Sequence, residues 1–178
     1  KKQWSTIIGA RYRDNQLLVN QKETSAQYQP AFADIQTFIT YQKKEAWKFQ
    51  FLGSISRNEY DYSPQTRQTN FGTLAEPRAL LVYYSGQEKD VYQTYLGALK
   101  TTYQSTEKSQ YNLITSLYHT KEQEYFDILA QYLLGTPNTD IGSEDLGNVS
   151  FAEGIGSQHT HGRNDFDALI ASVDIKGK

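Results

Sequence analysis

Two alternating runs flank a charged turn in the stretch Ala33-Asp-Ile-Gln-Thr-Phe-Ile-Thr-Tyr-Gln-Lys-Lys-Glu-Ala-Trp-Lys-Phe-Gln-Phe-Leu-Gly-Ser-Ile-Ser56. In each run, apolar residues occupy every second position, and polar residues fill much of the remainder. Successive side chains of a β-strand point to opposite faces, so this period of two predicts strands with one apolar face. The break at Lys43-Lys44-Glu45 has the length of a hairpin turn. The stretch therefore predicts an antiparallel hairpin.

The same pattern recurs in four further runs, which are residues 4–13, 94–103, 111–118 and 168–176. Together with the hairpin they give six predicted strands of about 9–11 residues, the length that crosses a bilayer when a strand is tilted. No apolar run approaches the ~20 residues of a transmembrane helix. We therefore predict an all-β fold, an antiparallel segment of the wall of a transmembrane β-barrel.

The connections between these runs alternate between short and long. Residues 105–108 form a second short turn, whereas the other connections are predicted as long polar loops over 14–30, 58–90 and 120–164. Bacterial outer-membrane barrels have this asymmetry, because their periplasmic turns are tight and their extracellular loops carry function. The alternation therefore adds long extracellular loops to the predicted wall.

Two segments of these loops have patterns of their own. We expect residues 78–84 to form a strand that pairs with 91–95 across a turn at 85–90. Residues 124–134 fit either a strand or an amphipathic helix, and the alternation of their apolar residues favours a strand.

The predicted wall is incomplete by itself. The smallest bacterial barrels have eight strands, and an open sheet edge would leave backbone groups without hydrogen bonds in hydrocarbon. The chain has no Met, and it shows no secretory signal of the kind that exported proteins carry. We therefore expect residues 1–178 to be a piece of a longer mature protein. The net charge of -2 gives no basic surface for nucleic acid.

Several motifs are more specific than the alternation. They are Gly9-Ala-Arg-Tyr-Arg-Asp-Asn-Gln-Leu-Leu-Val-Asn20, Thr66-Arg-Gln-Thr-Asn-Phe-Gly-Thr73, Ser85-Gly-Gln-Glu88, Glu124-Tyr-Phe-Asp-Ile128, Gly142-Ser-Glu-Asp-Leu-Gly147 and His161-Gly-Arg-Asn-Asp165. In this order the chain resembles the barrel of large TonB-dependent outer-membrane receptors that have an N-terminal carboxypeptidase-regulatory-like domain. The family more often has Ala where this chain has Gly162.

The resemblance implies that residues 1–178 belong to the β-barrel domain of such a receptor, in the outer membrane of a Gram-negative cell. It implies a 22-stranded barrel and a plug domain, of which nothing is recognisable here. It also implies that the TonB complex, outer-membrane lipids and a surface lipoprotein are candidate partners. The expected function is active import of a small-molecule, glycan or peptide nutrient with TonB-derived energy.

Two groups of residues are candidates for work on a ligand. Loop residues with hydrogen-bond donors, a fixed cation or a flat ring suit sugars, peptides or siderophores, and these are Arg67, Gln68, Asn70, Tyr83, Tyr84, Arg163 and Asn164. The alternative is that Arg67 and Asn70 only tie their loop together, and for Arg163 and Asn164 a structural role is favoured. Residues expected to face the lumen are Arg11, Arg13, Gln36 and Lys100.

Neither an enzyme nor a bound cofactor or metal is predicted. Ser157 precedes His159 closely but lacks the strand-to-helix elbow of a serine hydrolase. Zinc sites need three or four ligands in tight geometry, and His119, His159 and His161 do not show such a set, so we expect solvated or packing histidines. The acidic stretch from Asp140 to Asp145 lacks the ligand spacing of a calcium loop.

Two other classes of protein compete with the receptor. A soluble, secreted all-β carbohydrate-binding module would stack its tyrosines on sugars and would bury the apolar rows against a second protein layer. An outer-membrane hydrolase would need catalytic groups, for which Ser157 is the only serine with a histidine close by in that motif.

Overall fold

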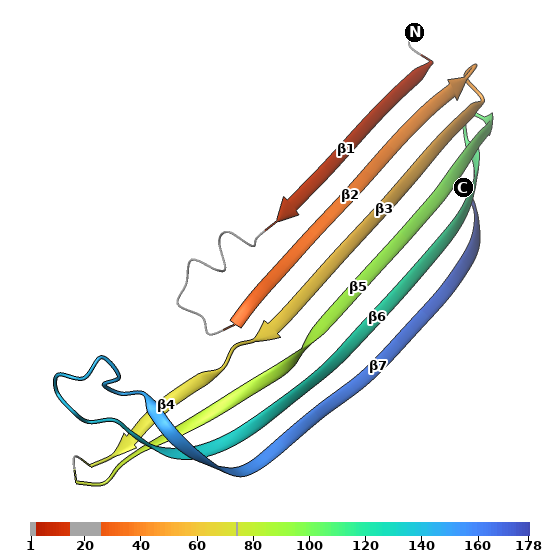
Figure 1. The fold of residues 1–178 in the computed structure, drawn as a ribbon. Helices are drawn as coiled ribbons and strands as arrows, with labels where there is room; N and C mark the ends of the chain where they lie inside the picture. Colours follow the sequence, from red (N-terminus) through yellow and green to blue (C-terminus); the bar gives the residue numbers. More distant parts are fainter. Residues whose placement is uncertain (1–2, 15–25, 74) are drawn as a thin grey trace.

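The computed structural model describes residues 3–14, 26–73 and 75–178, which form one antiparallel sheet (Figure 1). Its strands are β1 (Trp4–Asp14), β2 (Ala26–Lys43), β3 (Trp47–Pro64), β4 (Arg67–Gly72), β5 (Pro77–Thr106), β6 (Ser109–Pro137) and β7 (Val149–Gly177). Their order across the sheet is β1-β2-β3-β5-β6-β7, and β4 pairs with β5 beyond the end of β3. Each predicted run lies within one of the six strands of this path, so the all-β antiparallel prediction is confirmed. Among the described residues, no helix is long and apolar enough to cross a membrane.

The strands are much longer than the sequence predicts. β5 has 30 residues and β6 and β7 have 29 each, so the ranges 58–90 and 120–164 are mostly strand and the prediction of long loops there is wrong. Polar residues on both faces hide the alternation that would reveal such strands, whereas backbone pairing with neighbouring strands keeps these residues extended. Among the described residues, the segments that connect strands at this end are short, and the longest is residues 138–148.

The smaller predictions in these ranges have mixed outcomes. Residues 124–134 form strand, as the alternation favours. The turn at 85–90 is wrong, because residues 78–84 and 91–95 belong to one continuous β5 and both pair with β6. Most of the predicted loop 14–30 lies outside the described residues, and its last part belongs to β2.

Gly86 explains why the motif around it looks like a turn. It has a φ of 98° inside β5, and it still pairs with Ile128 of β6. Residues other than glycine rarely adopt this backbone conformation, and a Cβ here would overlap the backbone carbonyl oxygen of Asp127. Glycine inside a strand often marks a bend or a close backbone approach. In Figure 1 the long strands bend on their way toward β4.

The register divides the sheet into two chemically different faces, because directly paired residues share a face. One face carries an apolar band, and we use that name for Trp4, Ile8, Ala10, Tyr12, Ile35, Ile39, Tyr41, Trp47, Phe49, Phe51, Ile55, Tyr95, Leu99, Tyr103, Tyr111, Leu113, Leu117, Leu169, Ala171, Val173 and Ile175. Even on the inner strands these side chains are exposed, with 41% of Leu99 and 51% of Leu117 accessible to solvent. The other face, called the mixed face below, combines charged and polar residues with scattered apolar ones.

Aromatic rings border the apolar band at the end with the tight turns. Ring centroids of Trp4 and Tyr41 lie 4.3 Å apart, and those of Trp47 and Tyr103 lie 4.5 Å apart. Phe49 lies between these pairs, 6.3 Å from Tyr41 and 6.0 Å from Trp47. Such contacts contribute about 0.5–1.5 kcal/mol each beyond the area they bury. The aromatic rings therefore form a row beside the turns that crosses several strands.

At its other end, on β3 to β7, the band stops at a row of three charged side chains and one amide, called the charged row below. Arg57, Gln93, Lys121 and Asp167 occupy neighbouring positions across β3, β5, β6 and β7. From Tyr103 to Tyr95 the band extends about 26 Å along β5, at ~3.3 Å per residue. A strand tilt of ~40° would reduce this to about 20 Å, close to the height of a lipid-facing apolar zone.

Gly86→Ala should destabilise the sheet. The substitution forces a side chain into a left-handed backbone conformation against the Asp127 carbonyl, which we expect to lower the free energy of unfolding by about 1–3 kcal/mol. Gly156→Ala is the matched control, because a Cβ at Gly156 meets nothing within 4 Å. Urea unfolding of both variants in detergent measures the difference. Equal midpoints for the two variants would show that Gly86 has no special backbone role.

Candidate functional site

Candidate functional groups gather where the long strands continue beyond the apolar band. We call this part the polar extension, and it comprises residues 77–93 of β5, 121–137 of β6 and 149–167 of β7. Because side chains alternate along each strand, the polar extension presents one set of residues on the mixed face and another on the face of the apolar band.

On the mixed face, Glu124 is the centre of a hydrogen-bond network. The Tyr92 hydroxyl donates to Glu124 Oε1 at 2.6 Å, and Asn164 Nδ2 donates to Glu124 Oε2 at 3.2 Å. These bonds lower the pKa of the Glu124 carboxyl, with the Tyr92 bond as the larger cause. The same bond, followed by burial, raises the pKa of Tyr92 to about 12. The network joins β5, β6 and β7 in one polar patch.

Asp90 extends this patch toward β5. It lies directly opposite Glu124, and its Oδ1 atom is buried without a hydrogen-bond partner among the described residues. Burial is the largest cause of the raised pKa of Asp90, and the nearby carboxylates of Glu88 and Glu124 add to it. Like charges directly opposite one another destabilise a sheet. The patch therefore offers hydrogen-bond acceptors that a polar or cationic ligand would satisfy.

Phe126 and Gly162 pair directly across β6 and β7, next to this patch. The Phe126 ring lies so close over Gly162 that a Cβ there would overlap ring carbon atoms. An aromatic ring over a cross-strand glycine shields the bare backbone. Only glycine at position 162 leaves room for the ring in this orientation.

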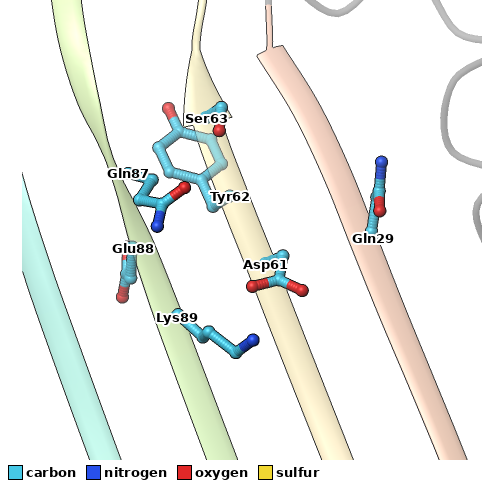
Figure 2. Close-up of a pocket in the computed structure, with 7 residues that line it drawn as sticks. All are labelled: Gln29, Asp61, Tyr62, Ser63, Gln87, Glu88 and Lys89. Atoms are coloured by element: carbon cyan, nitrogen blue, oxygen red, sulfur yellow. The ribbon is translucent and has the colours of Figure 1, made fainter.

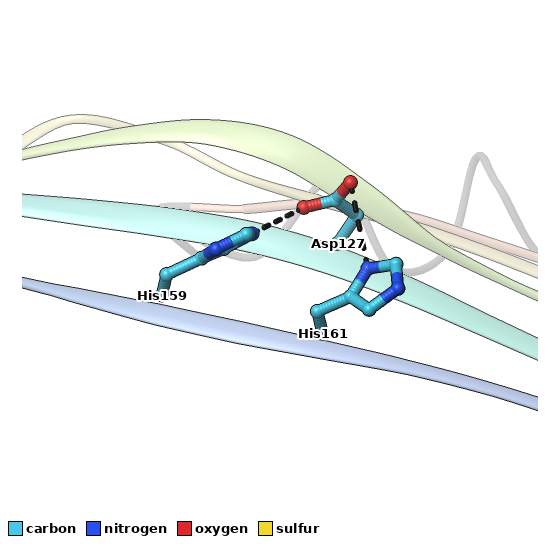
Figure 3. Close-up of side chains that lie close together, drawn as sticks. All are labelled: Asp127, His159 and His161. Atoms are coloured by element: carbon cyan, nitrogen blue, oxygen red, sulfur yellow. Dashed lines mark hydrogen bonds and ion pairs between the residues drawn. The ribbon is translucent and has the colours of Figure 1, made fainter.

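On the face of the apolar band, Asp127 contacts two histidines of the neighbouring strand (Figure 3). Asp127 Oδ1 lies 2.6 Å from His159 Nε2, and Asp127 Oδ2 lies 3.6 Å from His161 Nδ1. All three side chains are at least half exposed. The hydrogen bond with His159 is the largest cause of a lowered pKa for Asp127.

Sequence reasoning considered the two histidines but missed Asp127. Their spacing of two residues places His159 and His161 on one face of a strand, which is the only local signal. Asp127 becomes their neighbour through the β6–β7 register, since it pairs directly with His161. His119 does not join them, because it bonds Asp167 at 2.7 Å and lies about 26 Å away along β6, at ~3.3 Å per residue.

Two of the predicted ligand residues of β4, Gln68 and Asn70, contact each other, and Gln68 also contacts the loop 138–148. Gln68 Nε2 donates to Asn70 Oδ1 at 2.9 Å and to the Gly147 carbonyl at 2.7 Å. Arg67 lies on the same strand, opposite Val82 of β5. These bonds favour the alternative role for this group, in which polar side chains tie neighbouring segments together.

The remaining ligand candidates do not form one site. Tyr83 and Tyr84 are consecutive in β5, so their rings lie on opposite faces. Arg163 lies on the face of the apolar band, with its guanidinium 6.0 Å from the centre of the Tyr125 ring. Asn164 lies on the mixed face and is the one candidate that joins the Glu124 network.

All residues expected to face the lumen share the mixed face. Arg11 and Gln36 lie on paired strands, and the register places Arg13 and Lys100 on the same side. Arg11 Nε donates to both carboxylate oxygens of Asp34, at 2.9 and 3.2 Å. Asp34 is buried, with 7% of its surface exposed, so its ion pair holds Arg11 against the sheet.

Two open grooves lie beside residues of the polar extension. One, of about 280 Å³, lies where β3 ends beside β5 and is lined by Gln29, Asp61, Tyr62, Ser63, Gln87, Glu88 and Lys89 (Figure 2). The other, of about 430 Å³, is lined by Gln87, Lys89, Tyr125, Phe126, Asp127, His161, Gly162, Arg163 and Asp165. The first groove is lined mainly by polar groups, and the second combines hydrogen-bonding side chains with a larger share of apolar surface. Ser157 lies opposite Gln131, and the His159 Nε2 that a catalytic serine would use is bonded to Asp127.

Comparison of the chain with protein-family models, curated proteins and solved structures finds no match. The relation to TonB-dependent receptors therefore stays a prediction from the sequence motifs.

Glu124→Gln should lower the pKa of Tyr92 from about 12 toward its ordinary value of 10, because the charged hydrogen-bond acceptor is lost. In the unmodified protein the folded state keeps this proton longer than the unfolded state, so the contribution of Tyr92 to stability falls between pH 10 and about 12. Ultraviolet titration of phenolate, corrected with Tyr92→Phe, measures the pKa. Glu122→Gln is the control, since Glu122 is the weakest cause of the shift. A Tyr92 titration that is unchanged in Glu124→Gln would contradict the network.

Proposed function

We propose that the chain is part of the barrel wall of a TonB-dependent outer-membrane receptor that imports a polar nutrient. The observation that supports this most is the apolar band on one face of an antiparallel meander, bordered by aromatic rings at one end and a charged row at the other. Between those borders no Asp, Glu, Lys or Arg of the described residues lies on that face. A lipid-facing barrel surface has this arrangement.

The free energy of transferring the apolar side chains of the band from water favours contact with lipid. Full burial of one large apolar side chain contributes about 1.5–3 kcal/mol, and the band contains many such side chains. Within the described residues the structure is a single sheet, and no second layer covers the band. Hydrocarbon would cover it in a membrane. The competing carbohydrate-binding module needs a protein layer in the same place.

The edges of the sheet also support the proposal. Among the described residues, β1 and β7 each pair with one neighbour, so each leaves a row of backbone donors and acceptors open. In hydrocarbon such groups must be paired, which further barrel strands would provide. The closed 22-stranded barrel, its plug and its coupling to TonB come from the family resemblance and complete the proposal.

The polar extension suggests how a ligand reaches the wall. From Gln93 to Pro77 of β5 it continues about 53 Å beyond the band, at ~3.3 Å per residue, as paired strands with few loops. The mixed face of this part would line the entry route, with the Tyr92–Glu124–Asn164 network as contacts for hydroxyl or ammonium groups. Stiff strands would hold these contacts in place before a ligand arrives. The substrate class that fits is a polar small molecule, glycan or peptide, and no chemical step is required.

Spin labels along β6 test the proposal. In the native protein reconstituted in lipid, single cysteines at Leu113, Leu117 and Lys121 sample the band face, and Ile114, Ser116 and Tyr118 sample the mixed face. The collision rate with lipid-soluble oxygen should be high at Leu113 and Leu117, low at the mixed face and low again at Lys121. Labels at Leu113 and Leu117 that are shielded from oxygen by protein, as a second layer would require, would reject the membrane wall.

A charge in the middle of the band should lower the free energy of unfolding. Leu117→Lys places an ammonium at the centre of the proposed hydrocarbon zone, with an expected loss of about 2–4 kcal/mol. Ser116→Lys is the matched control, because it adds the same charge one residue away on the opposite face. Urea unfolding from lipid vesicles measures both. Equal losses would contradict a lipid-facing band.

A further inference from the structure

We propose that Asp127, His159 and His161 form a binding site for a zinc-type divalent transition metal. The inference concerns the outward side of the polar extension and is independent of how the barrel transports its ligand. One carboxylate and two imidazoles are the donor set of many three-ligand zinc sites, in which water takes the fourth position. Imidazole donors favour first-row transition metals over Ca²⁺ and Mg²⁺, which prefer oxygen ligands.

The sheet itself brings the three donors together. Asp127 pairs directly with His161, and His159 occupies the next position of β7 on the same face, on the diagonal from Asp127. Figure 3 shows the two imidazoles on one strand and the carboxylate on the other, all on the same side of the ribbon. Because the positions are set by backbone pairing of β6 and β7, little order has to be gained when a metal binds.

The distances allow a metal after small side-chain rotations. One ligand atom from each residue lies within 4.8 Å of the other two. A tetrahedral zinc ion with arms of ~2.0–2.1 Å needs its ligand atoms about 3.4 Å apart. His159 Nε2 already lies 2.6 Å from one carboxylate oxygen, and His161 Nδ1 lies 3.6 Å from the other. The exposed imidazoles have the rotational freedom to close the remaining gap.

The surroundings leave room for an open position. Asp127, His161 and Gln87 all line the groove of about 430 Å³. Gln87 is the β5 partner of Asp127, so its amide lies on the same face, next to the carboxylate. Arg163 is the nearest cation of β7 on this face, and its guanidinium lies over the Tyr125 ring. A water or small anion at the fourth position would therefore point into the groove.

Cobalt is a suitable probe because tetrahedral Co²⁺ absorbs visible light. Titration of the metal-free native protein with Co²⁺, followed by displacement with Zn²⁺, should show one site that depends on all three ligands. Asp127→Asn, His159→Gln and His161→Gln should each weaken binding by at least the ~10–100-fold that loss of a supporting group causes. His119→Gln is the matched control, because it removes a histidine bonded to an aspartate elsewhere in the same sheet and should leave binding unchanged.

X-ray absorption of the unmodified protein loaded with Zn²⁺ gives a second measurement that needs no variant. The expected spectrum has the multiple scattering of two imidazoles and ligand atoms at ~2.0–2.1 Å. Three results overturn the proposal. They are an affinity for Co²⁺ that is the same in the three ligand variants as in the unmodified protein, a spectrum without imidazole scattering, and the absence of binding at millimolar metal.

Discussion

The register between neighbouring strands is the constraint on which the rest of the structure depends. β5, β6 and β7 pair over almost their whole length, with one irregularity near the Ser105–Lys108 turn and others near Leu133 and Pro137. Because side chains alternate, a slip of one residue would move every side chain of a strand to the other face. The uninterrupted pairing from Tyr111 to Tyr132 of β6 therefore fixes the apolar band and the polar extension together.

Gly86 lets β5 run without a break from the apolar band into the polar extension. A turn there would have ended the pairing of β5 with β6 and released the segment beyond it as a loop. The glycine instead takes an unusual φ within the strand, so both sides keep the same partner. The residues beside it, Gln87 and Asp127, consequently keep the face that the register gives them. The conformation of this one glycine thus keeps Asp127, beside the two histidines, on the face of the apolar band.

The sequence predicts strands where one face of the strand is apolar, but it does not predict them where both faces are polar. In the band, residues such as Ile35 and Ile39 alternate with polar neighbours, and all six strands could be predicted from that contrast. In the polar extension, a run such as Lys121-Glu-Gln-Glu124 carries no alternation, so strand was taken for loop. The Asp127 cluster and the Glu124 network could not be predicted, because both depend on which residue of β7 lies opposite which residue of β6.

The same alternation separates the two candidate sites by a few residues. Glu124 and Phe126 point to the mixed face, whereas Tyr125 and Asp127 point to the face of the apolar band. In the proposed barrel, the first pair would meet the entry route and the second pair would face outward, beyond the lipid. A ligand bound at Glu124 and a metal bound at Asp127 would then be separated by the thickness of one sheet. Because β6 and β7 carry residues of both sites, binding on one face would stiffen the strands that position the groups on the other.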